Sequence, residues 1–328
     1  MIGDENSGAA LPDVEELLAT AVAVRLPMRT RFRGLTARET MIFSGPAGWG
    51  EFGPFVEYDD VEASSWLRAG IEAAYLGPPP AVRDVVPLNA TVPAIPADDV
   101  AELLRRYPGA GTAKVKVAEP GQTLDDDVAR VAATRDVIGR VRVDANGGWS
   151  VDEAITALRA IGDLEYAEQP CRTVEELAAV RRAVAVPIAA DESIRKADDP
   201  YRVIAAGAAD VAVVKVAPLG GMRRTLELAD TLGLDIVVSS ALDSAIGVSA
   251  GVAAAAALPR LELACGLGTG SLFTEDVAEP FLMSDGVVEP RWFGPGAVVD
   301  ATGLAVDHDR QEWWRDRLRR CHRLLLRK

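Results

Sequence analysis

The chain has 328 residues, 49% of them apolar, and its 49 acidic and 35 basic side chains give a net charge of −14. This length provides a large core in one domain or two, and the negative charge argues against nucleic acid as a partner because phosphates would be repelled. The three widely spaced cysteines predict neither a disulfide framework nor a zinc site and favour a cytoplasmic location. The acidic N-terminus does not predict a signal peptide, and no apolar run is long enough to predict a membrane span.

Residues 1–84 combine strand and helix patterns. A strand is predicted at 19–25. Two further strands, at 39–44 and 50–56, flank the turn sequence Gly-Pro-Ala-Gly and predict a hairpin. Apolar residues recur at helical spacing over 59–75 after acidic residues at the start, and a run of prolines then ends the helix.

From residue 85 the pattern changes to short β-branched or apolar runs that alternate with helical segments. Eight such runs are predicted strands: 85–92, 113–118, 141–145, 164–168, 186–190, 211–216, 235–240 and 261–265. Helix-length connections imply a parallel sheet, and eight units imply a closed barrel. The alternative is an open doubly wound sheet, but no strand is followed by a glycine-rich dinucleotide fingerprint.

The segment after the last strand predicts a hairpin around Asp285 and Gly286 and a final helix over 310–327. The apolar residues of this helix recur at helical spacing and would share one face: Trp314, Leu318, Cys321 and Leu325. Such a face favours packing on the rest of the protein. The arginines around it leave contact with a membrane surface as the alternative.

Polar side chains close most of the predicted barrel strands. They recur at intervals that match one strand–helix unit: Lys114, Lys116, Asp144, Glu168, Asp191, Lys215, Ser239 and Ser240. Groups at this spacing lie at the same end of neighbouring strands, which in a parallel barrel is the C-terminal mouth where active sites occur. Singly, such residues are typical of solvated edges or helix caps. Together, six charges within otherwise apolar strands would be costly without a function.

Three of these groups are adjacent carboxylates that repel one another unless a cation joins them: Asp144, Glu168 and Asp191. Such oxygen ligands suit Mg²⁺, with Mn²⁺ as a substitute. The metal would act as a Lewis acid when a proton next to a substrate carboxylate is removed. Lys116 and Lys215 would face this small-molecule carboxylate substrate from opposite sides, and Lys114, on the same strand face as Lys116, would favour its neutral form.

The motifs around these residues resemble the enolase superfamily and, within it, the muconate-lactonizing-like subgroup: Lys114-Val115-Lys116, Val143-Asp144-Ala145-Asn146-Gly147-Gly148-Trp149, Glu168-Gln169-Pro170, Ala190-Asp191-Glu192-Ser193 and Val214-Lys215. The resemblance implies an α/β fold, a modified TIM barrel (β/α)₇β with an α+β capping domain built from both termini. It implies a capping domain at 1–84, a barrel at 85–275 and a C-terminal segment at 276–328 that returns to the capping domain.

The resemblance also assigns roles. It implies Asp144, Glu168 and Asp191 as Mg²⁺ ligands and Lys116 and Lys215 as the catalytic pair. The mandelate-racemase subgroup is excluded because serines 239–240 stand where that subgroup has a histidine. The enolase subgroup itself fits poorly, because its paired glutamates have no counterpart here.

Within the subgroup, the segments 239–247 and 266–269 resemble the o-succinylbenzoate synthase family, whose members dehydrate 2-succinyl-6-hydroxy-2,4-cyclohexadiene-1-carboxylate in menaquinone biosynthesis. In that family the lysine matching Lys116 is the acid–base group, and the lysine matching Lys215 stays cationic against the dienolate. Predicted substrate contacts are Asn146, Ser239, Ser240, Gly266, Leu267, Gly268 and Arg31.

Three other functions compete with this activity. The sequence leaves the oligomeric state open. Dipeptide epimerases are excluded because Gly266-Leu267-Gly268 carries no acidic residue. An N-acylamino-acid racemase stays open because it uses the same two lysines, both as bases. A non-catalytic barrel scaffold or binding module would be expected to have lost ligands, whereas all six charged residues are present. Loops at 29–34 and 47–52 are further candidates for substrate specificity.

Overall fold

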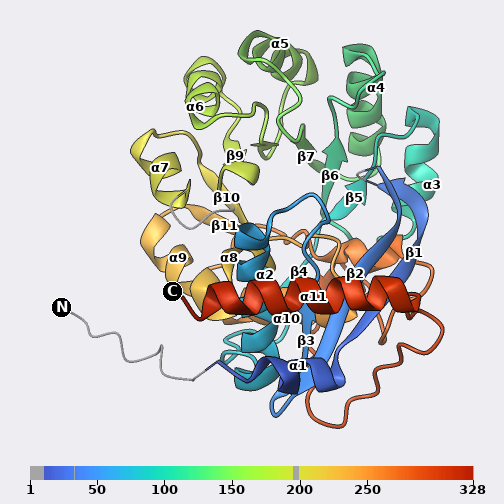
Figure 1. Cartoon of the computed structure of the whole chain (residues 1–328). Helices are drawn as coiled ribbons and strands as arrows, with labels where there is room; N and C mark the ends of the chain where they lie inside the picture. Colours follow the sequence, from blue (N-terminus) through green and yellow to red (C-terminus); the bar gives the residue numbers. More distant parts are fainter. Residues whose placement is uncertain (1–10, 33, 195–198, 328) are drawn as a thin grey trace.

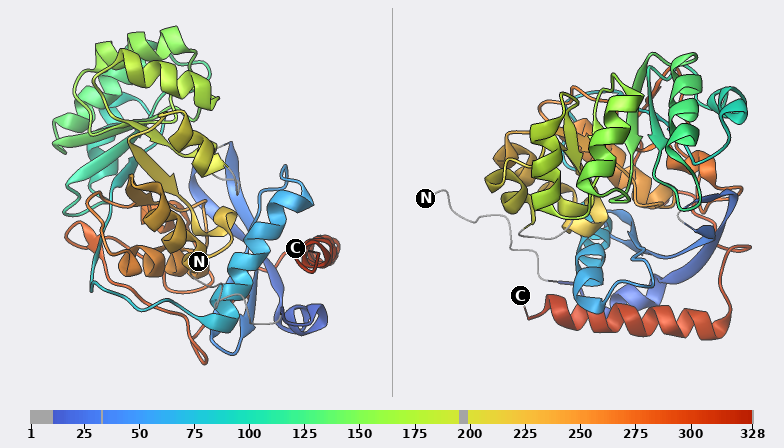
Figure 2. Two further views of the ribbon diagram at one scale, coloured as in Figure 1. Left: turned by 90° about the vertical axis from the view of Figure 1, so that its left-hand side faces the viewer. Right: turned by 90° about the horizontal axis from the view of Figure 1, so that it is seen from above.

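The computed structural model describes most of the chain, namely residues 11–32, 34–194 and 199–327. A three-stranded antiparallel sheet lies beside a curled parallel sheet that is surrounded by helices (Figure 1). The C-terminal helix α11 (His308–Leu325) runs along the outer side of the N-terminal sheet, away from the barrel (Figure 2). Among the described residues, no helix is both long enough and apolar enough to cross a bilayer.

The N-terminal sheet is a meander of β1 (Val22–Phe32), β2 (Leu35–Gly45) and β3 (Gly48–Phe52). The predicted hairpin is confirmed as β2 and β3. The predicted strand at 19–25 starts too early, because helix α1 (Val14–Thr20) precedes β1. The side chain of Asp13 accepts a hydrogen bond from the backbone of the following turn and begins this helix.

Helix α2 (Asp60–Leu76) confirms the predicted helix and packs on β3 through glycine. A Cβ atom added at Gly50 would lie 2.1 Å from the carbonyl oxygen of Gly70. Only a strand and a helix without side chains at this crossing can approach so closely. The segment 47–52, expected as a specificity loop, is therefore mostly the fixed strand β3.

The barrel sheet contains seven parallel strands in sequence order: β5 (Ala90–Val92), β6 (Thr112–Lys116), β7 (Arg140–Asp144), β8 (Ala167–Glu168), β9 (Ile188–Ala190), β10 (Val211–Val214) and β11 (Asp235–Val238). Its helical segments are η1 (Ala97–Asp99), α3 (Val100–Leu104), α4 (Leu124–Arg135), α5 (Val151–Ile161), α6 (Val174–Ala183), η2 (Glu192–Ile194), α7 (Asp199–Ala205), α8 (Val216–Leu219), α9 (Met222–Leu232), α10 (Ala245–Ala257) and η3 (Gly268–Leu272). Helices α4, α5 and α6 each begin with a capping box, at Thr123, Ser150 and Thr173.

The eighth predicted strand, 261–265, is not formed as a full strand. Instead, Cys265 bridges Leu88 and Gly266 bridges Ser239, both in parallel. The backbone nitrogen of Gly266 donates to Val238 at 2.9 Å, and that of Cys265 donates to Pro87 at 2.7 Å. Only the end of the predicted strand reaches both neighbours. These bonds close the ring, which contradicts the open doubly wound alternative.

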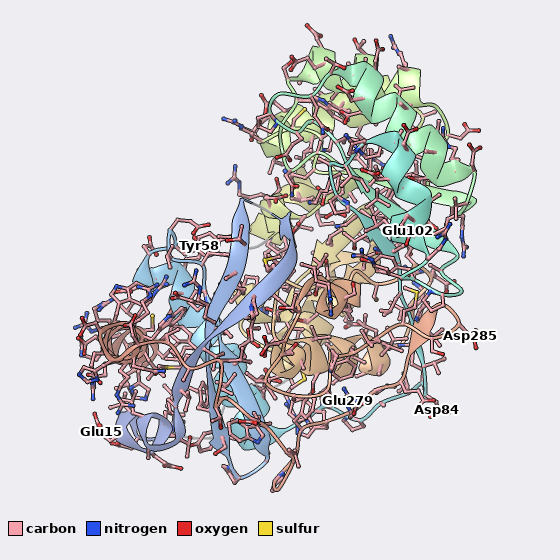
Figure 3. The ribbon with its side chains drawn as sticks, turned by 90° about the vertical axis from the view of Figure 1, so that its right-hand side faces the viewer. Glu15, Tyr58, Asp84, Glu102, Glu279 and Asp285 are labelled. Carbon is pink, nitrogen blue, oxygen red and sulfur yellow. The ribbon has the colours of Figure 1, made fainter. Side chains whose placement is uncertain are left out.

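The predicted hairpin in the tail is only partly correct. Asp285 and Gly286 form its turn with φ values of 49° and 78°, and Figure 3 shows Asp285 at the periphery of the molecule. Ser284 and Val287 exchange two backbone hydrogen bonds of 3.0 Å across this turn, so the hairpin exists as a single antiparallel pair. The strand that follows, β12 (Val287–Val288), pairs antiparallel with β4 (Val86–Pro87), which was not expected. Partner choice between distant segments leaves no local sequence signal.

Helix α11 packs on the N-terminal region, which supports the packed interpretation of its apolar face. Its four apolar residues named from the sequence are all buried. Arginines on its other faces contact acids of the N-terminal elements: Arg310 with Glu39 at 2.6 Å, Arg319 with Glu15 at 3.3 Å and Arg320 with Asp60 at 2.6 Å. Figure 3 labels Glu15 on α1. These contacts direct much of the basic charge toward the protein.

We expect Gly50→Ala to lower the free energy of unfolding by about 1–3 kcal/mol, because β3 and α2 must separate to admit a methyl group. Chemical denaturation measures the change. Gly303→Ala is the matched control: an added Cβ there meets nothing within 4 Å, so the change should stay within about 0.5 kcal/mol. Equal effects of the two substitutions would contradict the close approach.

Candidate active site

A cavity opens at the C-terminal ends of the barrel strands. Nine of the residues predicted for the site line it: Lys114, Lys116, Asp144, Asn146, Asp191, Lys215, Ser239, Ser240 and Gly266. Four further lining residues were not singled out as substrate contacts from the sequence: Thr91, Ala241, Leu242 and Thr269. Thr269 belongs to a segment that the sequence singled out, whereas Thr91 carried no signal of its own.

Strand register brings the charged groups to one level. Lys116 pairs with Asp144 across β6 and β7, and Asp144 pairs with Glu168 across β7 and β8. Residues two apart on a strand share a face, so Lys114 and Lys116 both point into the barrel. The recurring strand–helix spacing therefore produces a ring of charges at the mouth.

Each carboxylate of this ring is paired with a lysine. Lys114 Nζ lies 2.7 Å from Glu168 Oε1 and 3.2 Å from Asp144 Oδ2. Lys116 Nζ lies 2.5 Å from Asp144 Oδ2, and Lys215 pairs with Asp191. Within the described part of the chain, no three carboxylate, thiol or imidazole groups stand close enough to hold a metal ion as they are.

The pKa shifts show how tightly these charges are coupled. Burial raises the pKa of Glu168 to about 7, and the charges of Asp144 and Asp191 add to this shift. Burial would also raise the pKa of Asp144, but Lys116 and Lys114 lower it below its ordinary value. Burial opposes the charged form of Lys114, yet Glu168 and Asp144 raise its pKa above the ordinary value.

The three carboxylates fit a divalent cation in charge and donor chemistry. They supply oxygen donors from adjacent strands, and the mutual repulsion felt by Glu168 is what a cation relieves. Lys114 Nζ touches both Asp144 and Glu168, so these two lie within reach of one small ion. The assignment of individual metal ligands stays a prediction.

Other residues of the predicted motifs hold the ring in place. Gln169 follows Glu168, and its amide donates to the Ser193 hydroxyl at 2.8 Å and accepts from the backbone nitrogen of Asp191 at 3.0 Å. Asn146 accepts from Lys116 Nζ at 2.5 Å and donates to Glu192 at 3.1 Å. The motif residues next to the charged side chains thus hold those side chains in place.

A buried arginine beneath the mouth was missed. Arg142 is two residues before Asp144 on β7 and is fully buried. It pairs with Glu165, donates to the carbonyl of Ala264 at 2.7 Å and lies 4.6 Å from the centre of the Tyr166 ring. Strand alternation from Asp144 was the signal that could have found it.

Three predicted site residues with described side chains are not among those that line the cavity: Glu168, Leu267 and Gly268. Glu168 is buried and pairs with Lys114, which does line the cavity. The Leu267 side chain is buried and faces Gly251, and Gly268 begins η3 close to Asn89 and Tyr107. Because the Leu267 side chain fills the core, Leu267 could contribute only its backbone to a substrate, as expected for the 266–269 loop, and its role stays a prediction.

Arg31 belongs to β1, but its side chain lies outside the described part of the structure.

Thr269 Oγ1 is buried at the cavity without a hydrogen-bond partner among the described residues. The chain's two histidines both lie on α11, and His322 Nε2 is 2.9 Å from the carbonyl of Pro12. Neither histidine reaches the mouth.

Comparison with known proteins matches both parts of the chain. Residues 98–312 match the family model described as enolase C-terminal domain-like, and residues 23–74 match enolase N-terminal domain-like. The o-succinylbenzoate synthase of Mycolicibacterium smegmatis is 59% identical over 320 residues, covering 96% of this chain and 99% of that protein. The protein of the same name from Mycobacterium ulcerans is 58% identical over 324 residues, covering 98% of each chain.

Among solved structures, the muconate lactonizing enzyme from Pseudomonas putida superposes with a TM-score of 0.71 at 22% identity, covering 89% of this chain and 97% of that one. This likeness concerns the fold alone. Family models that span most of the chain, together with full-length relatives, make this chain a member of the enolase superfamily.

Proposed function

We propose that this chain is a metal-dependent lyase, an o-succinylbenzoate synthase that dehydrates 2-succinyl-6-hydroxy-2,4-cyclohexadiene-1-carboxylate to 2-succinylbenzoate. The full-length relatives of that name carry the proposal. The geometry supports it, because acid–base and charge-stabilising groups face one cavity at the barrel mouth.

Lys116 is proposed to transfer the proton. It lines the cavity, and Asp144 and Asn146 hold its Nζ atom. The neutral amine takes the proton next to the substrate carboxylate. The resulting ammonium then gives a proton to the departing hydroxide, so that water leaves from the same face. One lysine thus acts first as base and then as acid.

Lys215 is proposed to supply charge. Strands β6 and β10 are four strands apart in the sheet order, which places Lys116 and Lys215 on opposite sides of the ring. Lys215 is buried and held against Asp191. A fixed cation there stabilises the negative charge that develops on the substrate when the proton leaves.

We propose Mg²⁺ as the divalent cation, with Asp144, Glu168 and Asp191 as its protein ligands and Mn²⁺ as a substitute. When bound, it would polarise the substrate carboxylate as a Lewis acid. Lys114, which contacts both Asp144 and Glu168, favours the ionised form of these carboxylates and orients them.

The substrate contacts are proposed along the wall of the cavity that Ser239, Ser240, Gly266 and Thr269 form. The buried Thr269 hydroxyl has no partner among the described residues and is the proposed donor to the succinyl carboxylate, with backbone of Gly266 beside it. Ser239 and Ser240 line the same place, and their hydroxyls, which donate to Gly266 and Asp243 in this structure, would turn to the substrate when it binds. Asn146 lines the cavity next to Lys116, and Gly268 can contribute only backbone. Arg31 stays a candidate from the N-terminal sheet.

An N-acylamino-acid racemase is the second candidate, because Lys116 and Lys215 lie on opposite sides of the ring, as racemisation requires. The non-catalytic scaffold is disfavoured, because a ring of six buried or partly buried charges is costly to keep without a reaction.

Removal of divalent metal should abolish activity. Dialysis against EDTA should lower the dehydration rate by about 100-fold or more, since Lewis-acid stabilisation is worth several kcal/mol. Mg²⁺ should restore the rate, and Mn²⁺ should restore at least part of it. Ultraviolet absorbance of the aromatic product follows the reaction. Full activity in the chelator would contradict metal dependence.

Lysine variants separate proton transfer from charge. Lys116→Ala should lower the rate about 100-fold to 10,000-fold, because the acid–base group is lost. Lys215→Arg should retain more activity than Lys215→Ala, because arginine keeps the cation but does not act as a base. Circular dichroism and thermal melting verify folding. The prediction holds provided the guanidinium fits the site; a folded Lys215→Arg that binds substrate but is as inactive as Lys215→Ala would assign Lys215 a proton-transfer role.

Two substrates distinguish the candidate functions. The wild-type enzyme should dehydrate the cyclohexadiene, and this rate should exceed the exchange of the α-proton of an N-succinylamino acid in deuterated water. Nuclear magnetic resonance measures the exchange. Rapid exchange with no dehydration would make the chain a racemase.

A further inference from the structure

Two buried residues of the N-terminal sheet contact the barrel segment between β11 and α10. Arg38 on β2 donates from Nε to the carbonyl of Leu242 at 3.2 Å. Glu51 on β3 accepts from the backbone nitrogens of Ser244 and Gly247, each at 3.0 Å, and from the Ser244 hydroxyl. Arg38 was not singled out from the sequence, and Glu51 was included only as part of the specificity candidate 47–52.

Glu51 is fitted to the start of helix α10. The first backbone N–H groups of a helix lack partners within the helix and carry partial positive charge. The Glu51 carboxylate satisfies two of them, and Thr40 on β2 donates to its other oxygen at 2.9 Å. A Cβ at position 247 would lie 2.8 Å from Glu51 Oε2, so the glycine there leaves room for the contact.

The segment held in this way forms a wall of the candidate active site. Ser239, Ser240 and Leu242 all line the cavity. Leu242 has a φ of 62°, a conformation that a leucine adopts only when its surroundings impose it. Its carbonyl is the acceptor for Arg38. The side chain of Asp243 accepts from Ser240 Oγ at 2.9 Å and closes the turn.

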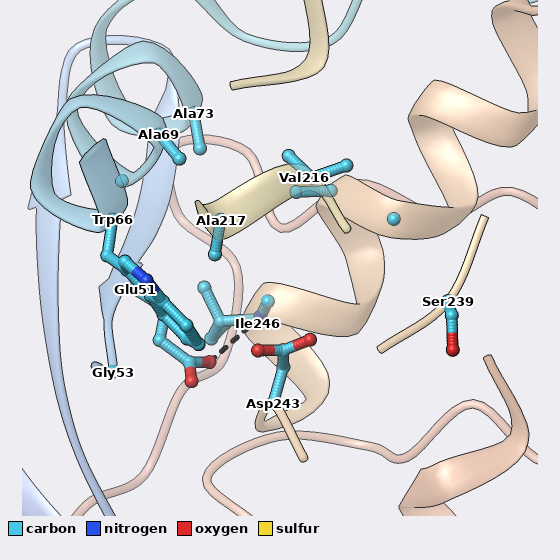
Figure 4. Close-up of a pocket in the computed structure, with 14 residues that line it drawn as sticks. Glu51, Gly53, Trp66, Ala69, Ala73, Val216, Ala217, Ser239, Asp243 and Ile246 are labelled. Carbon is cyan, nitrogen blue, oxygen red and sulfur yellow. Dashed lines mark hydrogen bonds between the residues drawn. The ribbon is translucent and has the colours of Figure 1, made fainter. Parts of the chain in front are cut away.

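Behind this wall is a second, small and partly open hollow of about 20 Å³. Figure 4 shows Asp243 and Glu51 at its lower side, with Trp66 and Ala217 above them and Ser239 at a distance. At Ser239 the wall has a cavity on each side, because this residue lines both cavities. Polar contacts to Leu242 and Asp243 add to the packing of the buried Ala241 and Leu242 in holding this segment.

We infer that Glu51 and Arg38 are positioning residues, which fix the Ser239–Leu242 wall and thereby set the affinity for the succinyl arm of the substrate. The inference rests on the proposed function. The N-terminal sheet thus affects specificity through the barrel backbone, without its own side chains touching the substrate at this wall.

Asp276 provides a matched control. Its carboxylate accepts from the backbone nitrogen of Ala245 at 3.0 Å and so caps the same helix. Among the described residues, Asp276 makes no hydrogen bond to residues 239–242, and it does not line the cavity. Loss of Asp276 therefore removes a cap of α10 without releasing residues 239–242.

The test compares Glu51→Ala, Glu51→Gln and Asp276→Ala with the cyclohexadiene substrate. Glu51→Ala should raise KM about tenfold or more while kcat stays within about threefold, because binding of a non-reacting group is lost. Glu51→Gln should return KM to within about threefold of wild type, since its amide oxygen can still accept from α10. Asp276→Ala should leave KM within about twofold.

Hydrogen exchange gives a readout that does not depend on turnover. Amides of residues 239–247 should exchange faster in Glu51→Ala, whereas Asp276→Ala should leave 239–242 unchanged. Should Glu51→Ala not fold, Arg38→Met releases the Leu242 carbonyl and should produce the same KM rise. An unchanged KM in the released variants, or an equal rise in Asp276→Ala, overturns the inference. Wild-type protein without dehydratase activity refutes the proposed function, and the exchange comparison still decides the positioning role.

Discussion

Mutual neutralisation of buried charges is the constraint on which the rest of the structure depends. Asp144, Glu168 and Asp191 are all buried at the barrel mouth, and each contacts a lysine. None of these charges could be buried alone, because an uncompensated ion in a poorly solvated site costs several kcal/mol. The strands must therefore keep their register, and hydrogen bonds made by Gln169 and Asn146 help to hold the charged groups of neighbouring strands in place.

The ring could be predicted from sequence because its information is periodic. A polar residue at each strand end recurs with the strand–helix repeat, and parallel strands then bring these residues together. Glu51 could not be predicted in this way. Its partner is a helix terminus almost two hundred positions later, and nothing near Glu51 in the chain specifies that contact. Pairing of β12 with β4 was missed for the same reason.

Local backbone and side-chain geometry was the second kind of feature that could not be predicted from the sequence. The positive φ of Leu242 and the inward side chain of Leu267 depend on neighbours from other elements. Propensity would assign neither residue such a conformation. The serines 239–240 were recognisable as polar groups at a strand end, whereas the backbone that presents them is determined by contacts from the N-terminal sheet.

The seam of the barrel has a consequence for how the chain is made. The segment that closes the ring at Cys265 and Gly266 continues directly to Phe273, which bridges Met28 of β1, and Thr274 donates to Pro27 at 2.9 Å. An early strand thus receives a partner from the last quarter of the chain. On the ribosome this strand emerges long before that partner, and contacts so distant in sequence form slowly. Until that partner emerges, this edge of β1 stays unpaired, and an unpaired strand edge is a site where other chains can add.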